Sequence, residues 1–263
     1  MFNEIAKIYH FMKRDALSFS TYKTHVLLTI LGSVFGALSY ALLGSNATMQ
    51  AVIKNYNMSF FTYLLIGVSF NTYIGQSLTW VTRSINPWSL EETLVSPTKL
   101  WTFIIGSSLW GFILSTATLF CYLIIGVIAF GLTLAINWPA TILVLALGIL
   151  TFEGIGMIGA GFLIVSKQGE PVTWLVGILT SVFGNVLFPP TVMPYYLAMI
   201  SYIFPPYYFF TSIRFTLTGH TFFDILPFVS ILALMSAIVL FIGYLVFSFG
   251  LRMAKKAGTL AWY

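Results

Sequence analysis

Ile225–Leu251 reads ILPFVSILALMSAIVLFIGYLVFSFGL and contains no charged side chain. A helix rises about 1.5 Å per residue, so this stretch can cross the roughly 30 Å hydrocarbon core of a bilayer. Five further stretches are equally apolar, and almost every charged residue lies between them. They are Val26–Leu43, Phe60–Val81, Trp101–Leu132, Pro139–Val165 and Pro171–Leu187. The sequence therefore predicts an all-α integral membrane protein with six transmembrane helices.

The composition supports this class. Charged residues make up 7% of the chain and hydrophobic residues 59%, whereas soluble domains carry about 25% charged residues. Six spans occupy nearly the whole length, which predicts a single transmembrane domain over residues 1–263. The one cysteine, Cys121, lies in an apolar stretch and is interpreted as a packing residue.

The basic residues divide unequally between the two sides of such a protein. Only Lys54 and Arg214 fall on one side, and ten fall on the other. Loops rich in Lys and Arg stay in the cytoplasm, so both termini are predicted to be cytoplasmic. The net charge of +5 then reflects topology and attraction to anionic lipids, not a nucleic-acid partner. The ten are Lys7, Lys13, Arg14, Lys23, Arg83, Lys99, Lys167, Arg252, Lys255 and Lys256.

Residues 2–22 precede the first span and carry apolar side chains at spacings of three and four. Charged residues such as Glu4, Lys7 and Arg14 fall largely on the opposite face. This pattern is typical of an amphipathic helix in the membrane interface; the alternative is a solvated leader. The apolar positions are Ile5, Tyr9, Met12, Ala16 and Phe19.

The outer segment 188–224 is apolar but interrupted by prolines, which makes each part too short to span. It predicts two re-entrant half-helices that dip into the outer leaflet. The alternative is an ordinary interfacial belt of aromatic side chains. The prolines are Pro189, Pro190, Pro194, Pro205 and Pro206.

Residues 86–97 form the loop between the second and third spans. Ser89 and Glu92 make a capping box, and Pro97 ends the helix that they start. The result is a helix of about two turns on the cytoplasmic face, with Leu90, Leu94 and Val95 as its apolar side chains. Such a short helix is unstable alone in water, so it needs a partner surface, either the membrane domain itself or another protein.

Two segments carry a resemblance to a known family. The loop contains a variant of a coupling-helix pattern in Glu91, Glu92, Thr93, Leu94, Ser96 and Pro97. The outer segment matches a second pattern in Met193, Pro194, Pro205, Tyr208 and Arg214, and Gly184 fits the same pattern upstream of the segment. The usual residues of that pattern are replaced at Thr180, Phe183 and Pro206. Together with the topology and length, these segments resemble the permease subunits of type-2 ABC exporters over the whole chain.

The resemblance implies a homodimer of permeases in the cell membrane that recruits two copies of a separate ATPase. In this interpretation Ser89–Pro97 is the coupling helix, in which Glu91 and Glu92 are exposed contacts and Leu94 is the apolar plug. The first and fifth spans would form the dimer interface, where Gly177 and Gly184 permit close approach. Met193, Pro194, Pro205, Tyr208 and Arg214 become candidates for the translocation path or its gate.

The chain has no Gly-x-x-x-x-Gly-Lys-Ser/Thr loop, so ATP and Mg²⁺ would be bound by the partner ATPase and no cofactor is expected in this chain. His10, His25 and His220 are scattered, and no metal-ligand or nucleophile pattern appears. We therefore expect a transport subunit and not an enzyme. Few charged groups and 17% aromatic residues favour an amphipathic substrate: a lipid, a drug-like molecule or a lipid-linked glycan.

Glu153 lies near the middle of the fourth predicted span. A charge there costs several kcal/mol, so this carboxyl must be protonated, paired or in contact with water. Either it lines the translocation path, or it is protonated and hydrogen-bonds a neighbouring helix. Candidate partners for the second case are Ser107, Ser108, Thr116 and Thr118. An ion-coupled secondary carrier that uses Glu153 is the alternative function, although the chain lacks further intramembrane carboxylates.

The letters of Gly154–Gly159 match a dinucleotide-binding fingerprint. The match lies inside an apolar span and not between a strand and a helix, so it does not indicate nucleotide binding. The glycines are interpreted as sites of close helix contact or of a bend. They are Gly154, Gly156, Gly159 and Gly161.

Overall fold

The computed structural model describes residues 2–21, 23–44, 58–84, 100–166 and 170–257. This part of the chain is helical, and its only β feature is an isolated bridge between Ala135 and Thr218. Six helices correspond to the six predicted stretches: α2 (Lys23–Gly44), α4 (Phe60–Ser84), α6 (Leu100–Phe130), α7 (Trp138–Ser166), α8 (Glu170–Phe183) and α11 (Phe222–Ala257). The others are α1 (Phe2–Thr21), the 3₁₀ turn η2 (Pro190–Val192), α9 (Tyr195–Ile203) and α10 (Pro205–Leu217).

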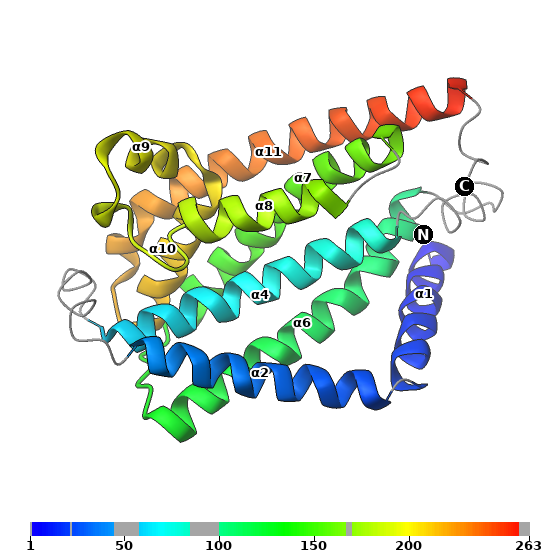
Figure 1. Ribbon diagram of the computed structural model, residues 1–263. Coiled ribbons are helices and arrows are strands. Elements are labelled where there is room, and N and C mark those ends of the chain that lie inside the picture. The colour runs from blue at the N-terminus through cyan, green and yellow to red at the C-terminus, as the bar shows by residue number, and fades with distance from the viewer. Residues whose placement is uncertain (1, 22, 45–57, 85–99, 167–169, 258–263) are drawn as a thin grey trace.

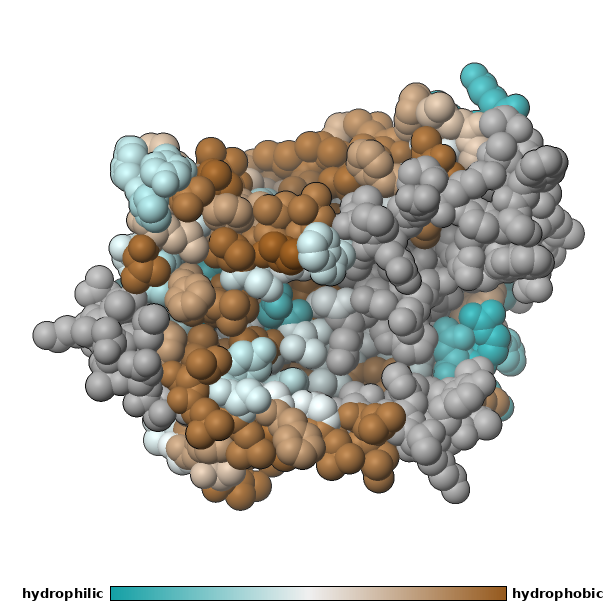
Figure 2. Space-filling view, in the orientation of Figure 1, coloured by the Kyte–Doolittle hydropathy of each residue, from teal (hydrophilic) through white to brown (hydrophobic). Residues whose placement is uncertain are grey.

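The helices that correspond to the predicted stretches form a bundle, with α1 across one end and α9 and α10 at the other (Figure 1). Each of the six predicted stretches is a helix. Within the described residues, three are long and apolar enough to cross a membrane: Leu109–Phe130, Trp138–Val165 and Phe222–Ala254. Hydrophobic side chains cover much of α2, α8 and α11 on the face shown in Figure 2. The helical membrane class agrees with the prediction, and the number of spans stays a prediction.

The helix α8 ends at Phe183, four residues before the predicted boundary at Leu187. Asn185 has a φ of 63°, in the left-handed region where helices commonly terminate. After this end come the two short helices of the outer segment, as the proline pattern predicts. Prolines occupy the start of α10, where the missing N–H has no intrahelical partner to lose.

The helices α7 and α11 run parallel and touch through glycines seven residues apart. Gly154 and Gly161 of α7 lie against Gly243 and Gly250 of α11. A Cβ on Gly154 would come within 2.7 Å of the Leu240 nitrogen, so the two backbones are in direct contact. In lipid, small residues allow the close packing that holds helices together. The interpretation of Gly154 and Gly161 as sites of close helix contact is confirmed.

Polar side chains also join α7 to α11. The hydroxyls of Thr151 and Ser236 lie 2.7 Å apart, and Ser236 also donates to the carbonyl of Leu147 (3.1 Å). These bonds join the two helices at residues of α7 that precede Gly154. The pair therefore has one defined register.

The helix α10 lies inside the bundle. Phe209 contacts Phe70 of α4 and Phe152 of α7 edge to face, with ring centroids 6.3 and 5.8 Å apart. Its ring also occupies the space beside Gly148, where a Cβ would collide with it. The outer segment is thus anchored in the core by α10.

We expect Gly154→Ala to lower the thermal unfolding midpoint in detergent. The added methyl meets backbone atoms of α11, which cannot move aside as a side chain can, and overpacking of this kind costs about 1–3 kcal/mol. Gly75→Ala on α4 is the matched control, because a Cβ there meets no atom within 4 Å. Equal midpoints for both variants would contradict the close contact.

Candidate functional site

The predicted coupling helix, residues 86–97, lies outside the described residues, so its structure stays a prediction. Its flanks are described: α4 ends at Ser84 and α6 begins at Leu100. The start of α6 is therefore the nearest described part of the chain to the predicted ATPase contact.

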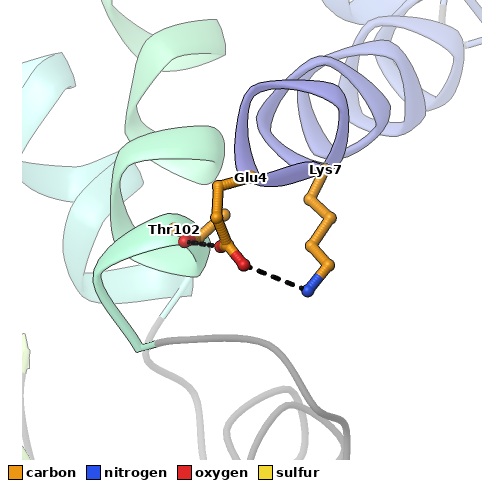
Figure 3. A network of polar contacts seen from close by, with 3 residues as sticks. All are labelled: Glu4, Lys7 and Thr102. Atoms are coloured by element: carbon orange, nitrogen blue, oxygen red, sulfur yellow. Dashed lines mark hydrogen bonds and ion pairs between the residues drawn. The ribbon is translucent and has the colours of Figure 1, made fainter. Parts of the chain in front are cut away.

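The helix α1 is hydrogen-bonded to the first turn of α6 (Figure 3). The Glu4 carboxylate accepts a hydrogen bond from the Thr102 hydroxyl and pairs with the Lys7 ammonium at 3.3 Å. One turn further along α6, a Cβ on Gly106 would lie 2.9 Å from Cβ of Phe11, so the helices are in close contact.

The opposite face of α1 carries apolar side chains that no described residue covers. Ile5 is 65% exposed and Tyr9 54% exposed, and both belong to the predicted apolar stripe. The helix is thus free to present these side chains to lipid while Phe11 packs on α6.

At the other end of the bundle, Arg214 of α10 is completely buried. Its Nη1 donates to the carbonyls of Asn185 (2.6 Å) and Phe210 (3.4 Å). Its Nη2 donates to the carbonyls of Val186 (2.9 Å) and Tyr63 (3.2 Å), and Nε donates to Tyr63 as well (3.3 Å). These four carbonyls form what we call the guanidinium cage. They come from the start of α4, the end of α8 and α10 itself.

Side chains complete the guanidinium cage. The Tyr63 ring lies beneath the guanidinium, with Cζ of Arg214 3.7 Å from the ring centroid, a cation–π contact. The Tyr63 hydroxyl donates to the backbone and side-chain oxygens of Asn185. The Asn185 amide in turn donates to the Thr211 hydroxyl at 2.9 Å. Tyr63, Asn185 and Thr211 are thus joined by side-chain hydrogen bonds beside the buried cation.

Local sequence explains why the cage forms here. The left-handed turn at Asn185 frees the carbonyls that follow α8, and a planar guanidinium with several N–H groups can bind them together. Gly67 permits the approach, because a Cβ there would collide with Nη2 of Arg214 and with the Val186 carbonyl.

The remaining outer-loop candidates shape the turn between α9 and α10. Pro194 precedes the first residue of α9, and Pro205 is the first residue of α10. The Tyr208 hydroxyl donates to the Tyr202 carbonyl at 2.6 Å, across that turn. The sulfur of Met193 accepts from Ser201 of α9 at 3.9 Å.

Glu153 is partly buried on α7, between the buried residues Phe152 and Gly154. Two of its predicted partners are engaged elsewhere: Thr116 and Thr118 donate to carbonyls of their own helix at 2.7 and 3.0 Å. Among the residues that the structure describes, none donates a hydrogen bond to the Glu153 carboxyl. The side chains of Ser107 and Ser108 are not among those described.

The two glycines predicted at a dimer interface differ in their surroundings. A Cβ on Gly177 meets no atom within 4 Å, whereas one on Gly184 would collide with the Thr180 carbonyl and lie 3.2 Å from Pro206. Gly184 therefore packs inside its own chain. Exposed apolar side chains of α8 surround Gly177: Trp174, Leu175, Ile178 and Val182.

Between α4 and α8, Figure 2 shows a small group of hydrophilic side chains. Asn71 of α4 donates to Ser181 of α8 at 3.4 Å, so a polar contact joins these helices. In the described part of the chain, no three His, Cys, Asp or Glu side chains come close enough together to hold a metal ion.

The family model of ABC-2 type transporters matches residues 8–218 of the chain. The chain belongs to this family. The match extends from α1 through α10 and includes both the predicted coupling helix and the guanidinium cage. No curated protein shows significant similarity to the chain. The resemblance predicted from sequence is confirmed: this is an ABC-2 permease, the membrane component of an ABC transporter, and the family implies a partner ABC ATPase.

Sequence reasoning identified Arg214 in this ABC-2 permease but missed Tyr63, Gly67 and Asn185. The pair Gly184-Asn185 after an apolar stretch is a helix-end signal that would have placed the end of α8 correctly. Tyr63 and Gly67 give no such signal, because they are ordinary residues of an apolar helix.

We expect Arg214→Lys to lower the thermal unfolding midpoint of the permease. An ammonium has three donors on one atom and cannot reach all four carbonyls, and each buried group left unsatisfied costs about 1–3 kcal/mol. Arg252→Lys is the control, because Arg252 is exposed near the end of α11. A midpoint for Arg214→Lys equal to that of the control would show that the cage contributes little stability.

Proposed function

We propose that this ABC-2 permease exports an amphipathic molecule, such as a lipid, a drug-like compound or a lipid-linked glycan, driven by ATP hydrolysis in a separate ATPase. Two permease chains and two ATPase copies form the complex in the cell membrane. The match of residues 8–218 to the ABC-2 family carries the proposal. The low share of charged residues, 7%, and the 17% of aromatic residues support a substrate that is itself partly apolar.

In this proposal residues 86–97 dock into a cleft of the ATPase, with Leu94 as the buried anchor. The chain then enters α6 at Leu100, and α1 is joined to the first turns of α6 through Glu4 and Thr102. Movement of the docked segment therefore displaces α6 and α1 together.

We further propose six spans with both termini in the cytoplasm, α1 in the inner interface, and α9 and α10 re-entrant from the outside. The two short helices differ in a way that supports this arrangement. Phe209 and Arg214 of α10 are buried in the bundle, whereas Tyr195 and Ile203 of α9 are 78% and 72% exposed. Apolar exposure of this extent suits contact with lipid acyl chains.

The second permease copy is proposed to pack on α2 and α8. Gly177 leaves an open, flat position on α8, and the dimer proposal rests on it, since Gly184 is occupied inside the chain. The face of α2 is also apolar and exposed, with Leu28 at 63% and Phe35 at 65%.

Glu153 is proposed to line the translocation path. Its carboxyl neither accepts a hydrogen bond from a described residue nor donates one to it, which supports contact with water or substrate over a fixed structural bond. The same observation is compatible with the alternative, an ion-coupled carrier, which would transport without an ATPase.

We expect Leu94→Asp to abolish copurification of the permease with an ATPase encoded beside it, because a buried anchor of an interface contributes about 2 kcal/mol or more. Glu91→Gln is the matched control at the rim and should retain the partner. ATP-dependent transport of the substrate across the membrane of vesicles should stop when the phosphate-binding lysine of that ATPase is replaced. Transport by the permease alone, without any ATPase, would contradict the proposal.

We expect Glu153→Gln to reduce export while leaving the thermal unfolding midpoint near the wild-type value. The amide keeps the shape and hydrogen-bonding capacity of the side chain but removes its acidity. Normal export by this variant would assign Glu153 a structural role. Transport that instead follows an imposed pH gradient in the wild type, and fails in Glu153→Gln, would favour the ion-coupled carrier.

A further inference from the structure

Three segments that are distant in sequence meet at one guanidinium. Tyr63 stands in the first turn of α4, Asn185 and Val186 follow α8, and Arg214 belongs to α10. We propose that Arg214, Tyr63, Asn185 and Gly67 are positioning residues that hold these three helix ends as one rigid block. The inference rests on the proposed export function and adds how the outer gate moves: the block shifts as a whole, and α8 does not separate from α10.

The chemistry of the cage supports a unit that stays closed. If α8 moved away from α10, Arg214 would lose the carbonyls of Asn185 and Val186 together. A cation and two carbonyls would then be exposed to apolar surroundings, which is the most unfavourable way to break a buried polar contact. Movement of the whole block breaks none of these bonds.

Gly67 is the point at which the block is most sensitive. A side chain there would push against both the Nη2 atom of Arg214 and the backbone carbonyl of Val186. The guanidinium end can shift, but the carbonyl is fixed by the turn at Asn185. A methyl group at position 67 is therefore expected to open the cage. The substitution removes none of the hydrogen-bonding groups of the cage.

The helix α9 lies outside the block. Its side chains Tyr195, Tyr196 and Ile203 are 78%, 69% and 72% exposed, while all cage groups are buried. Within the outer segment, α10 thus belongs to the rigid part, whereas α9 presents exposed side chains to lipid or substrate.

The test measures one distance inside the chain by pulsed electron paramagnetic resonance. Spin labels replace Phe188, just after α8, and Phe223, in the first turn of α11; both are exposed, at 42% and 81%. The start of α11 is expected to move together with α10, because the rings of Phe215 and Phe228 pack with centroids 5.6 Å apart. All variants carry Cys121→Ser, and labelled chains are diluted with unlabelled ones so that only distances within a chain are observed.

We expect a narrow distance distribution in the wild-type complex, unchanged between the nucleotide-free state and the state trapped with ATP and vanadate. Gly67→Ala should broaden it, and Gly75→Ala on the same helix should not, because a Cβ at Gly75 has open space. Should Gly67→Ala fail to fold, Tyr63→Phe serves instead, since it keeps the ring under Arg214 and removes the hydroxyl that donates to Asn185.

A nucleotide-dependent shift of this distance in the wild type would overturn the inference, as would a Gly67→Ala distribution as narrow as that of Gly75→Ala. Failure of the proposed function looks different: no ATPase copurifies with the wild-type permease. The comparison of Gly67→Ala with Gly75→Ala in the isolated permease still decides whether the cage holds the three helix ends together.

Discussion

A polypeptide inside a membrane must satisfy its own backbone N–H and C=O groups, and this requirement decides where its helices can end. In this ABC-2 permease the requirement applies after Phe183, where α8 stops and Asn185 adopts a left-handed conformation. The carbonyls released there are bound by Arg214, which the chain supplies from α10. The early end of α8 and the burial of Arg214 thus depend on each other. The same side chain then fixes α10, and with it the outer segment, against α4.

Away from the helix ends, a different interaction holds the bundle together. Between α7 and α11 no hydrophobic driving force exists in lipid, so association depends on close packing. Gly154 and Gly243 bring the backbones into contact, and Thr151 with Ser236 adds a hydrogen bond. The helices α4 and α6 also meet along much of their length, through Phe61 with Phe130 and Tyr73 with Phe112. The α7–α11 contact has little room to slide, because backbone lies directly against backbone.

The sequence predicted what depends on local pattern and missed what depends on distant partners. Hydropathy identified all six long helices, and prolines identified α10 from its first residue at Pro205. Hydropathy also predicted that α8 continues to Leu187, whereas the helix ends at Phe183. A hydropathy pattern contains no information about a distant arginine that makes an earlier helix end favourable. The charge count placed Arg214 with the outer loop but could not indicate its burial. On α1 the apolar stripe indicated a lipid-facing side, yet helical periodicity alone does not distinguish lipid contact from the α6 contact made by Phe11.

In the export proposal, Glu153 lies beside the contact that joins α7 to α11. Successive helical residues point about 100° apart, so the contact of Gly154 with α11 directs Glu153 to the side of the α7–α11 seam and not into it. Because that seam is fixed by backbone contact, the carboxyl cannot change its surroundings by movement of α7 against α11. Any change in the surroundings of the Glu153 carboxyl must therefore come from movement of other helices. In the export proposal, α7 and α11 therefore keep their mutual position while the surroundings of Glu153 change.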